Sequence, residues 1–576
     1  MDSCVFSRLN RFIPTSIKYI KAGSPATIRQ DIAAGITVGI VALPLSMAFA
    51  IASGATPATG LFTAIIAGFI ISALGGTRFQ IGGPTGAFVI IISGIISRHG
   101  YDGLVVATIM AGLILVVMGA FGLGKLLQYI PYPVTTGFTS GIGLLIFSTQ
   151  IKDFLGLQLA HVPSDFLPRI KACVDGISTT DPSTLGLGLL TVGSMLLVRR
   201  FIPRIPAPFV GIAIATIVSY LLGLNTETIG SKFGGIPDSL PSYISLSNID
   251  LQHLKNLIPE AMTIAILAGI ESLLSATVAD GMSGDRHNSS NELVAQGLAN
   301  VASALFGGLP ATGAIARTAT NIRAGAFSPL AGVVHVLTLI LFVKVCAPLA
   351  SMIPLASLAG VLMLVAWDMS EVHRIKRLLF APKSDSVVML IALLLTVFVD
   401  LTVAVEVGVV MAAMLFMKRM SQLSDIHSLD EALPKEENIN RSNGQERVVV
   451  YEISGPMFFG MAQKFVNVMS FTRKKPEIIV LCMRLVPTMD ATGIEALETV
   501  VRKSQDNGIK VLLSGVHPRI MKIMQRLGTD KLIGDENIFP DFSTAISKGI
   551  LPEKEDDIGD RGCAVEESRK RLAAAE

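Results

Sequence analysis

Glu271 is the residue whose surroundings most clearly suggest chemistry. It stands in the sequence Ala268–Ser275 within a long apolar segment, and Ser275 follows one helical turn later on the same face. Because an apolar environment favours the neutral form of a carboxyl group, Glu271 could carry a coupling proton, or coordinate Na⁺ with nearby oxygen atoms. The alternative is a neutral glutamic acid that hydrogen-bonds two helices.

A glycine- and proline-rich sequence occurs once in each half of the chain. The first copy, Gly82–Ala87, contains Thr85 and Gly86, and the second copy is Gly307–Ala314. Matching interruptions of this kind in two halves indicate a transporter site, where two half-helices direct their unpaired N–H groups and positive dipole ends at an anion. The alternative is an ordinary helix-packing motif.

Arg317 follows Gly313 by one helical turn. It could add positive potential behind an anion site, or it could pair with Glu271 or another carboxylate. Four other acidic residues lie near expected helix ends, where solvated or interfacial roles are expected: Asp280, Asp368, Asp400 and Glu406.

Charge is distributed unevenly along the chain. Of the 576 residues, 51% are hydrophobic and 16% are charged, and the mean hydropathy is +0.60. Residues 31–420 hold only 40 charged side chains, whereas residues 421–576 hold 45. This pattern predicts a membrane domain joined to a soluble domain, and it excludes a single soluble enzyme, a disordered chain and a secreted disulfide scaffold. A net charge of +3 argues against nucleic-acid binding.

Residues 31–420 contain about 14 apolar segments that could span a membrane. They begin near Ile32, Pro57, Gln80, Leu104, Val134, Leu185, Pro208, Ala261, Leu293, Thr312, Leu330, Ile353, Val387 and Thr402. Basic residues such as Arg78, Lys125 and Arg286 flank alternate junctions. Since cytoplasmic loops are enriched in Lys and Arg, and the count is even, we expect both termini in the cytoplasm.

The C-terminal region reads as a small α/β domain, with strands near 447–453, 478–482 and 511–514 and helices near 461–471, 493–506 and 518–527. Asp490 and Thr492 lie where a loop enters a helix. They would cap that helix, or alternatively provide a regulatory hydroxyl, phosphate or nucleotide contact.

We therefore predict five regions: a cytoplasmic N-terminal segment (1–30), a transmembrane transport domain (31–420), a linker (421–443), a soluble domain (444–550) and a disordered tail (551–576). No nucleophile–base pair or phosphate-binding loop is recognisable, and the five cysteines lack ligand spacing. We expect no enzymatic activity, no cofactor and no metal.

The chain resembles the SulP anion transporters from about residue 25 to 550. In the membrane region the likeness is carried by residues 31–39, 82–86, 137–141, 270–274, 307–310 and 316–318, and Met489–Gly493 resembles the STAS domain of that family. Within the family, residues 150–158 and 366–370 look most like the bacterial C4-dicarboxylic acid transporters.

The resemblance implies an inverted repeat of seven plus seven helices, with core and gate subdomains, two half-helices, alternating access and a homodimer. It also implies a substrate and ion site between the half-helices. The residues assigned to that site are Thr85, Gly86, Glu271, Ser275, Gly313, Ala314, Ile315 and Arg317.

Two positions depart from the Na⁺-coupled bicarbonate members of the family. Ile315 stands where those members place a hydroxyl, and Ser275 replaces a threonine. The loss of one oxygen ligand favours proton coupling through Glu271 over Na⁺ coupling. In STAS-type anti-sigma antagonists the hydroxyl just before the glycine is phosphorylated, and Thr492 holds that place.

These observations together predict a secondary anion transporter in the cell's inner membrane, most simply an H⁺-coupled transporter of a C4-dicarboxylate. Two related functions remain open, a sulfate permease and a Na⁺/bicarbonate symporter. An alternative of another class is a non-transporting membrane sensor or scaffold that acts through its STAS-like domain. The expected partners are a small anion, a coupling H⁺, membrane lipid and a second copy of the chain.

Overall fold

The chain divides between Ala412 and Ala413 into a helical unit and a smaller α/β unit. The computed structural model describes residues 14–20, 24–127, 131–159, 162–163, 165–202, 205–235, 243, 251–399, 401–428, 441–442, 445–446, 448–470 and 476–550. The predicted tail (551–576), much of the predicted linker and the first 13 residues of the predicted N-terminal segment lie outside these residues.

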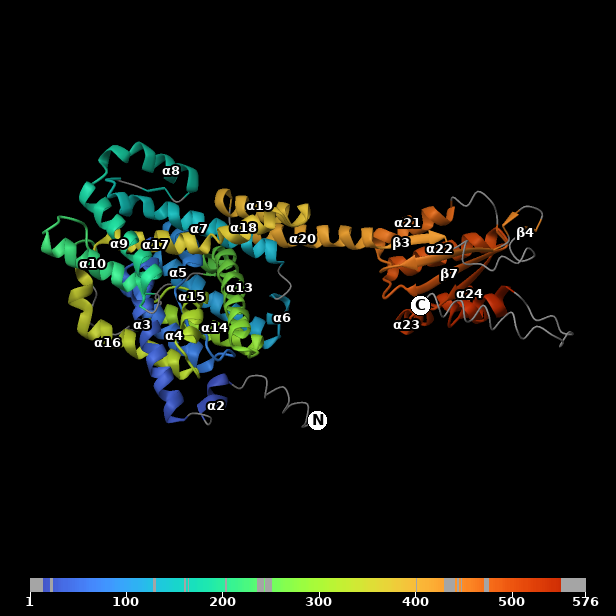
Figure 1. The fold of residues 1–576 in the computed structure, drawn as a ribbon, viewed down its shortest axis with the longest axis horizontal. Coiled ribbons are helices and arrows are strands. Elements are labelled where there is room, and N and C mark those ends of the chain that lie inside the picture. The colour runs from blue at the N-terminus through green and yellow to red at the C-terminus, as the bar shows by residue number, and fades with distance from the viewer. Residues whose placement is uncertain are drawn as a thin grey trace. The chain divides into compact units, whose positions relative to one another are not determined.

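Each predicted membrane segment contains a helix (Figure 1). The segments predicted from Gln80 and Thr312 first pass through the short strands β1 (Gly82–Gly83) and β2 (Thr312–Gly313). In chain order the helices are α2 (Thr15–Ile20), α3 (Pro25–Ala52), α4 (Pro57–Leu74), α5 (Val89–Ala120), α6 (Gly124–Leu127), α7 (Tyr132–Leu155), α8 (Phe166–Asp175), α9 (Pro182–Phe201), α10 (Ala207–Leu221), α11 (Ile229–Phe233), α12 (Leu251–Asn256), α13 (Ile258–Ser283), α14 (Ser289–Leu305), α15 (Ile315–Arg323), α16 (Leu330–Ser351), α17 (Leu355–Met369), α18 (Val372–Leu379), α19 (Lys383–Phe398) and α20 (Leu401–Leu423).

Within the described residues, eight helical stretches are long and apolar enough to cross a membrane. One of them, Gly86–Ala120, contains two of the predicted segments. Gly100, which has a φ of 71°, breaks α5 between these two segments. Only glycine adopts that conformation without a steric penalty. Most of the other predicted segments form shorter helices, such as α10, α14, α15 and α19.

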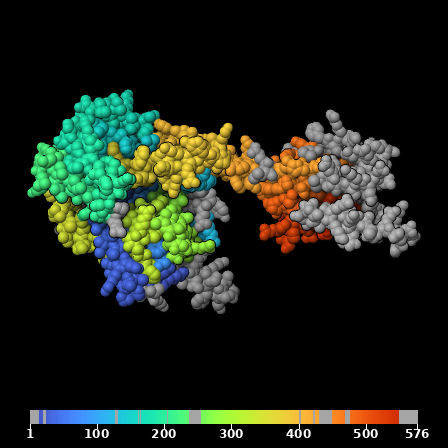
Figure 2. All heavy atoms as spheres, viewed as in Figure 1, coloured from blue at the N-terminus to red at the C-terminus, as the bar shows by residue number. Residues whose placement is uncertain are grey.

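The helices of the first unit pack as two groups. One group contains α3, α4, α5, α13, α14, α15 and α16, and the other contains α7, α9, α10, α17 and α19. Each group combines helices from both halves of the chain: α3 and α4, blue in Figure 1, pack against the yellow α16. In the space-filling view, the turquoise and green surface of α8–α10 likewise adjoins the yellow surface of later helices (Figure 2). This interleaving agrees with the predicted core and gate.

Glycines allow a close helix contact in the first group, between α5 and α14. A Cβ atom on Gly112 would lie 2.6 Å from the carbonyl oxygen of Gly297, and a Cβ on Gly297 would collide with the Gly112 carbonyl. The two backbones therefore touch where both side chains are absent. Apolar side chains gain little by moving from lipid into a helix interface. Membrane helices therefore associate through close packing, which small residues permit.

The second unit contains a five-stranded sheet in the order β3 (Asp425–Ser428), β6 (Val448–Ser454), β7 (Ile478–Leu485), β8 (Lys510–Ser514), β9 (Ile538–Phe539). Strand β3 is antiparallel to β6, and the other pairs are parallel. A separate short hairpin joins β4 (Arg441–Ser442) and β5 (Gln445–Glu446). The predicted strands correspond to β6, β7 and β8, while β3 comes before the boundary expected at residue 444.

Side chains alternate between the two faces of this sheet, as the period of a strand requires. Val449 and Tyr451 face a core formed with α21 (Phe459–Ser470), α22 (Ala491–Asp506), α23 (Pro518–Leu527) and α24 (Thr529–Ile533). Val448 and Val450 face the opposite side, where Phe542 of α25 (Phe542–Thr544) and Ile546 of the π-helical turn Ala545–Ile550 cover them.

Candidate functional site

Two short strands bring the repeated glycine sequences together. Strand β1 (Gly82–Gly83) is antiparallel to β2 (Thr312–Gly313), with Gly82 opposite Gly313. The amide of Ala314 also donates to the carbonyl of Ile81 at 2.9 Å. Two segments more than 200 residues apart therefore meet midway through the helical unit.

A helix begins immediately after each strand. The 3₁₀ turn η2 (Gly86–Phe88) leads into α5 after Thr85, and α15 begins after Ala314. Both residues have extended backbones, and neither provides a side-chain hydrogen bond to its helix. The first-turn N–H groups and the positive dipole ends of both helices thus lie next to the strand crossing.

Glu271 lies beside this crossing. Its Oε2 atom accepts a hydrogen bond from Oγ1 of Thr85 at 2.9 Å, which links the middle of α13 to the start of the first half-helix. The Glu271 side chain is half-buried. Its second carboxylate oxygen has no protein hydrogen bond among the described residues, so the group has acceptor or donor capacity for a ligand or a proton.

Arg317 lies behind the crossing and is 2% exposed. Its Nη2 atom donates to the carbonyl of Pro84, whereas Nη1 has no hydrogen-bond partner among the described residues. A Cβ atom on Gly83 would lie 2.5 Å from Nη1, so the glycine makes room for the guanidinium. Within the described part of the chain, Arg317 forms no ion pair with Glu271.

The other predicted site residues lie around the same crossing but contribute differently. Ser275 is fully buried, and its Oγ donates to Oγ1 of Thr318 at 3.2 Å, so it packs α13 against α15. Ile315 is 37% exposed, and Gly86 faces Phe49 and Ile146. The crossing therefore gathers Thr85, Glu271, Arg317 and the Gly313–Ala314 backbone, with Ser275 in its packing.

Comparison with known proteins agrees with this architecture. The model of the sulfate permease family matches residues 28–392, and that of the STAS domain matches residues 441–545. The chain belongs to the sulfate permease family. The predicted SulP membership, the helical transporter fold and the STAS domain are confirmed, and the protein is a multi-pass membrane protein of an anion transporter family.

Relatives within the sulfate permease family carry different substrate names. The putative sulfate transporter YvdB of Bacillus subtilis is 40% identical over 89% of this chain and 96% of its own length. The bicarbonate transporter BicA of Picosynechococcus sp. is 30% identical over 91% of this chain and 95% of its own. The predicted likeness to C4-dicarboxylic acid transporters finds no counterpart in these names.

Solved structures share the fold. The transmembrane domain of a cyanobacterial bicarbonate transporter BicA matches with a TM-score of 0.59 and 30% identity, covering 67% of this chain and 97% of that one. SLC26A9 matches with a TM-score of 0.81 over 95% and 94% of the two chains. At 18% identity the latter likeness shows the fold alone.

The sequence analysis missed a second buried acid in this sulfate permease family member. Glu292 of α14 is fully buried and accepts hydrogen bonds from the segment between α4 and β1. Glu292 directly precedes the apolar segment predicted from Leu293, so the sequence places it outside the membrane segments. Its polar neighbours Asn291 and Gln296 give this helix the polar face on which the network is built.

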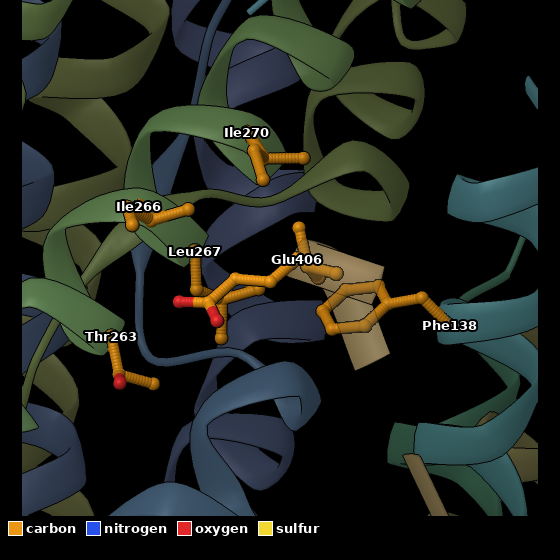
Figure 3. Close-up of a pocket in the computed structure, with 7 residues that line it drawn as sticks. Phe138, Thr263, Ile266, Leu267, Ile270 and Glu406 are labelled. Carbon is orange, nitrogen blue, oxygen red and sulfur yellow. The ribbon is translucent and has the colours of Figure 1, made fainter. Parts of the chain in front are cut away.

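A cavity borders α13 next to Glu271. It is lined by Phe138 of α7, by Val405 and Glu406 of α20 and by one face of α13 formed by Thr263, Ile266, Leu267 and Ile270 (Figure 3). Figure 3 shows the Glu406 carboxylate directed toward α13. Ile270 directly precedes Glu271, and Leu267 lies one helical turn before it, so the cavity reaches the turn of α13 that carries the site carboxylate.

The two candidate regulatory residues of the STAS domain have separate environments. Asp490 is the N-cap of α22: its Oδ1 accepts from the amide of Gly493 at 2.8 Å, and its Oδ2 accepts from the amide of Phe459 at 3.2 Å. Thr492 is exposed in the first turn of the same helix. Asp490 thus has the predicted capping role, while the Thr492 hydroxyl is open to solvent.

Proposed function

We propose that this member of the sulfate permease family imports a small dianion of the C4-dicarboxylate type together with H⁺, by alternating access. The supporting observation is the β1–β2 pairing, which brings two helix N-termini, the unpartnered Nη1 of Arg317 and Glu271 to one place. Helix N-termini and a buried guanidinium attract an anion without requiring an exposed lysine.

Proton coupling is supported by the surroundings of Glu271. Among the described residues, its one protein hydrogen bond comes from Thr85, so protonation would cost few existing contacts. A neutral Glu271 would remove a negative charge from the vicinity of the bound anion, so binding of the proton and the anion would reinforce each other. The side chain of Ile315 offers no oxygen atom for Na⁺, which supports H⁺ as the coupling ion.

The packing of two helix groups supports alternating access. The site residues Thr85, Glu271 and Arg317 belong to the first group, and the cavity lined by Phe138 and Glu406 lies where α13 faces helices outside that group. Sliding of one group past the other would expose the site alternately to the two sides of the membrane. We further propose an inner-membrane location, cytoplasmic termini, which the basic residues at alternate junctions favour, and a homodimer, which the resemblance implies.

Sulfate and bicarbonate are the competing substrates, because the relatives YvdB and BicA carry those names. The deciding experiment measures uptake by purified protein in liposomes. Radiolabelled succinate, fumarate, sulfate and bicarbonate would each be offered with an inward pH gradient, with an inward Na⁺ gradient and with neither. We expect accumulation of a dicarboxylate driven by the pH gradient. Failure to accumulate either dicarboxylate would refute the substrate, and a strict Na⁺ requirement would refute H⁺ coupling.

The role of Glu271 is tested by Glu271→Gln. Because glutamine cannot exchange a proton, we expect gradient-driven uptake to fall to the level of empty liposomes while the protein still folds and inserts. Glu260→Gln is the matched control: it removes a carboxylate from the same helix, where Glu260 pairs with His99 at 3.4 Å, and we expect it to transport normally. Unchanged proton-driven uptake by Glu271→Gln would make Glu271 structural, and no uptake by the native protein would favour a sensor or scaffold.

A further inference from the structure

Glu292 is a buried carboxylate surrounded by hydrogen-bond donors. Its Oε2 accepts from the amide of Gly76 at 2.9 Å and from Oγ1 of Thr77 at 2.8 Å, and its Oε1 accepts from Nε2 of Gln80 and Nε2 of Gln296, each at 3.0 Å. A carboxylate can accept several such bonds at once. A longer bond of 3.5 Å from Oγ of Ser272 to Oε1 brings the number of donors among the described residues to five. Three of the five belong to the short segment that leads from α4 into β1, so Glu292 fixes the path of the chain toward the strand crossing.

Gln80 transmits this constraint to both halves of the site. Its Nε2 atom also donates to Oγ of Ser272 at 2.7 Å, and Ser272 directly follows Glu271 on α13. On its other side the amide of Gln80 packs against Gly313: the three atoms nearest to a Cβ on Gly313 would all be Gln80 side-chain atoms, and the closest would collide. One buried amide thus touches α13, α14 and the second half-helix entry.

From these contacts we infer that Gln80, held by Glu292, is a positioning residue that sets the geometry of the two half-helix N-termini relative to Glu271, and thereby the affinity for the anion. Gln80 is 3% exposed and Glu292 is fully buried, so both act through the crossing and not by touching the substrate. The inference rests on the proposed function and deepens it.

The contrast with Glu271 separates the two acids. Among the described residues, Glu271 accepts one protein hydrogen bond, whereas a proton on Glu292 would disrupt a set of five. Glu271 therefore carries the coupling proton and Glu292 does not. Loss of Glu292 should weaken anion binding while leaving the pH dependence of transport in place.

Concentration-dependent uptake tests the inference in Glu292→Gln and Gly313→Ala, with Glu260→Gln as the control. Because each change disturbs a buried polar contact, we expect KM to rise at least about tenfold in the first two variants, with a smaller change in the maximal rate. The pH profile should stay native in both. An unchanged KM with a rate reduced in proportion to folded protein would overturn the positioning role. A flattened pH profile in Glu292→Gln would also overturn it.

A double-mutant cycle tests the contact between Gln80 and Gly313. Gln80→Ala removes the side chain with which a Cβ on residue 313 collides, so the double variant Gln80→Ala/Gly313→Ala should have a KM no higher than Gln80→Ala alone. KM increases that simply multiply would mean that the two residues act independently and would refute the inference. The same cycle can be measured from anion binding without transport, as the thermal stabilisation of each variant in detergent when the anion is added.

The two hypotheses fail differently. If the proposed function is wrong, the native protein shows neither uptake nor stabilisation by any dicarboxylate at any pH. If only the inference is wrong, the native protein transports and the Glu292 and Gly313 variants bind with native affinity.

Discussion

At the scale of single residues, burial alone does not identify the role of an acid in this protein. Glu271 and Glu292 both lie in the helical unit, yet in the part of the chain that the structure describes Glu271 has one hydrogen-bond donor and Glu292 has five. The number of donors decides which carboxylate can exchange a proton without disturbing the fold. The same distinction applies in the STAS domain, where Asp490 is held by two amides and Thr492 is exposed.

This contrast predicts different outcomes for Asp490→Ala and Thr492→Ala. Loss of the N-cap should destabilise α22 by about 1 kcal/mol, so its amides should exchange hydrogen roughly fivefold faster in the full-length protein. Asp490→Asn keeps a capping oxygen and should retain most of the protection. Thr492→Ala should leave exchange nearly native, because no cap depends on it. Hydrogen-exchange mass spectrometry measures these exchange rates. Equal acceleration of exchange in the two alanine variants would contradict the different roles of Asp490 and Thr492.

How much of the site could be predicted differs from residue to residue. Glu271 was identifiable because it interrupts a long apolar run, and the two glycine–proline sequences because they recur. Gln80 and Glu292 carry no such signal, since their importance comes from contacts between α4, α13 and α14 that only the folded chain creates. For Arg317 the sequence left two roles open, and the direct ion pair with Glu271 is absent among the described residues.

At the scale of elements, the long apolar segments of the sequence predicted the positions of the helices well, whereas the shortest strands could not be predicted. The segments predicted from Pro57 and Leu330 begin at the observed residues, and β6, β7 and β8 were each recognisable. Strands β3 and β9 have only four and two residues, too few for an alternating pattern to be seen. The break at Gly100 was implied by two predicted segments, which the structure joins as one kinked helix.

The glycine contact between α5 and α14 predicts a position-specific cost for added side chains. A Cβ on Gly112 would lie 2.6 Å from the Gly297 carbonyl, so Gly112→Ala should force the helices apart and cost about 1–3 kcal/mol. Gly193 of α9 is the matched control, because nothing lies within 4 Å of a Cβ there, and Gly193→Ala should be neutral or slightly stabilising. Thermal unfolding in detergent measures the unfolding midpoint of each of the two variants. Equal midpoints for the two variants would show that the backbones are not in close contact.

At the scale of the whole molecule, the uneven distribution of charge was enough to separate the membrane and soluble parts. The family matches at residues 28–392 and 441–545 and the division between Ala412 and Ala413 agree with it. The grouping of helices into two packed sets was not predictable from composition, because it depends on which helices of one half meet those of the other. The resemblance to SulP transporters supplied that expectation instead.

The basic residues at alternate junctions predict the orientation of the whole chain. With cytoplasmic termini, the loop after α13 faces the cytoplasm and the turn before α9 faces outward, because Lys and Arg are retained on the cytoplasmic side.

Ser283 and Ser178 are exposed in these two regions and can each be changed to cysteine conservatively. In a background without the five native cysteines, a membrane-impermeant maleimide should label Ser178→Cys in intact spheroplasts. Ser283→Cys should be labelled only after permeabilisation. The reverse pattern would place the STAS domain outside the cytoplasm and refute the orientation, whereas labelling of both sites in intact spheroplasts would contradict an odd number of crossings between them.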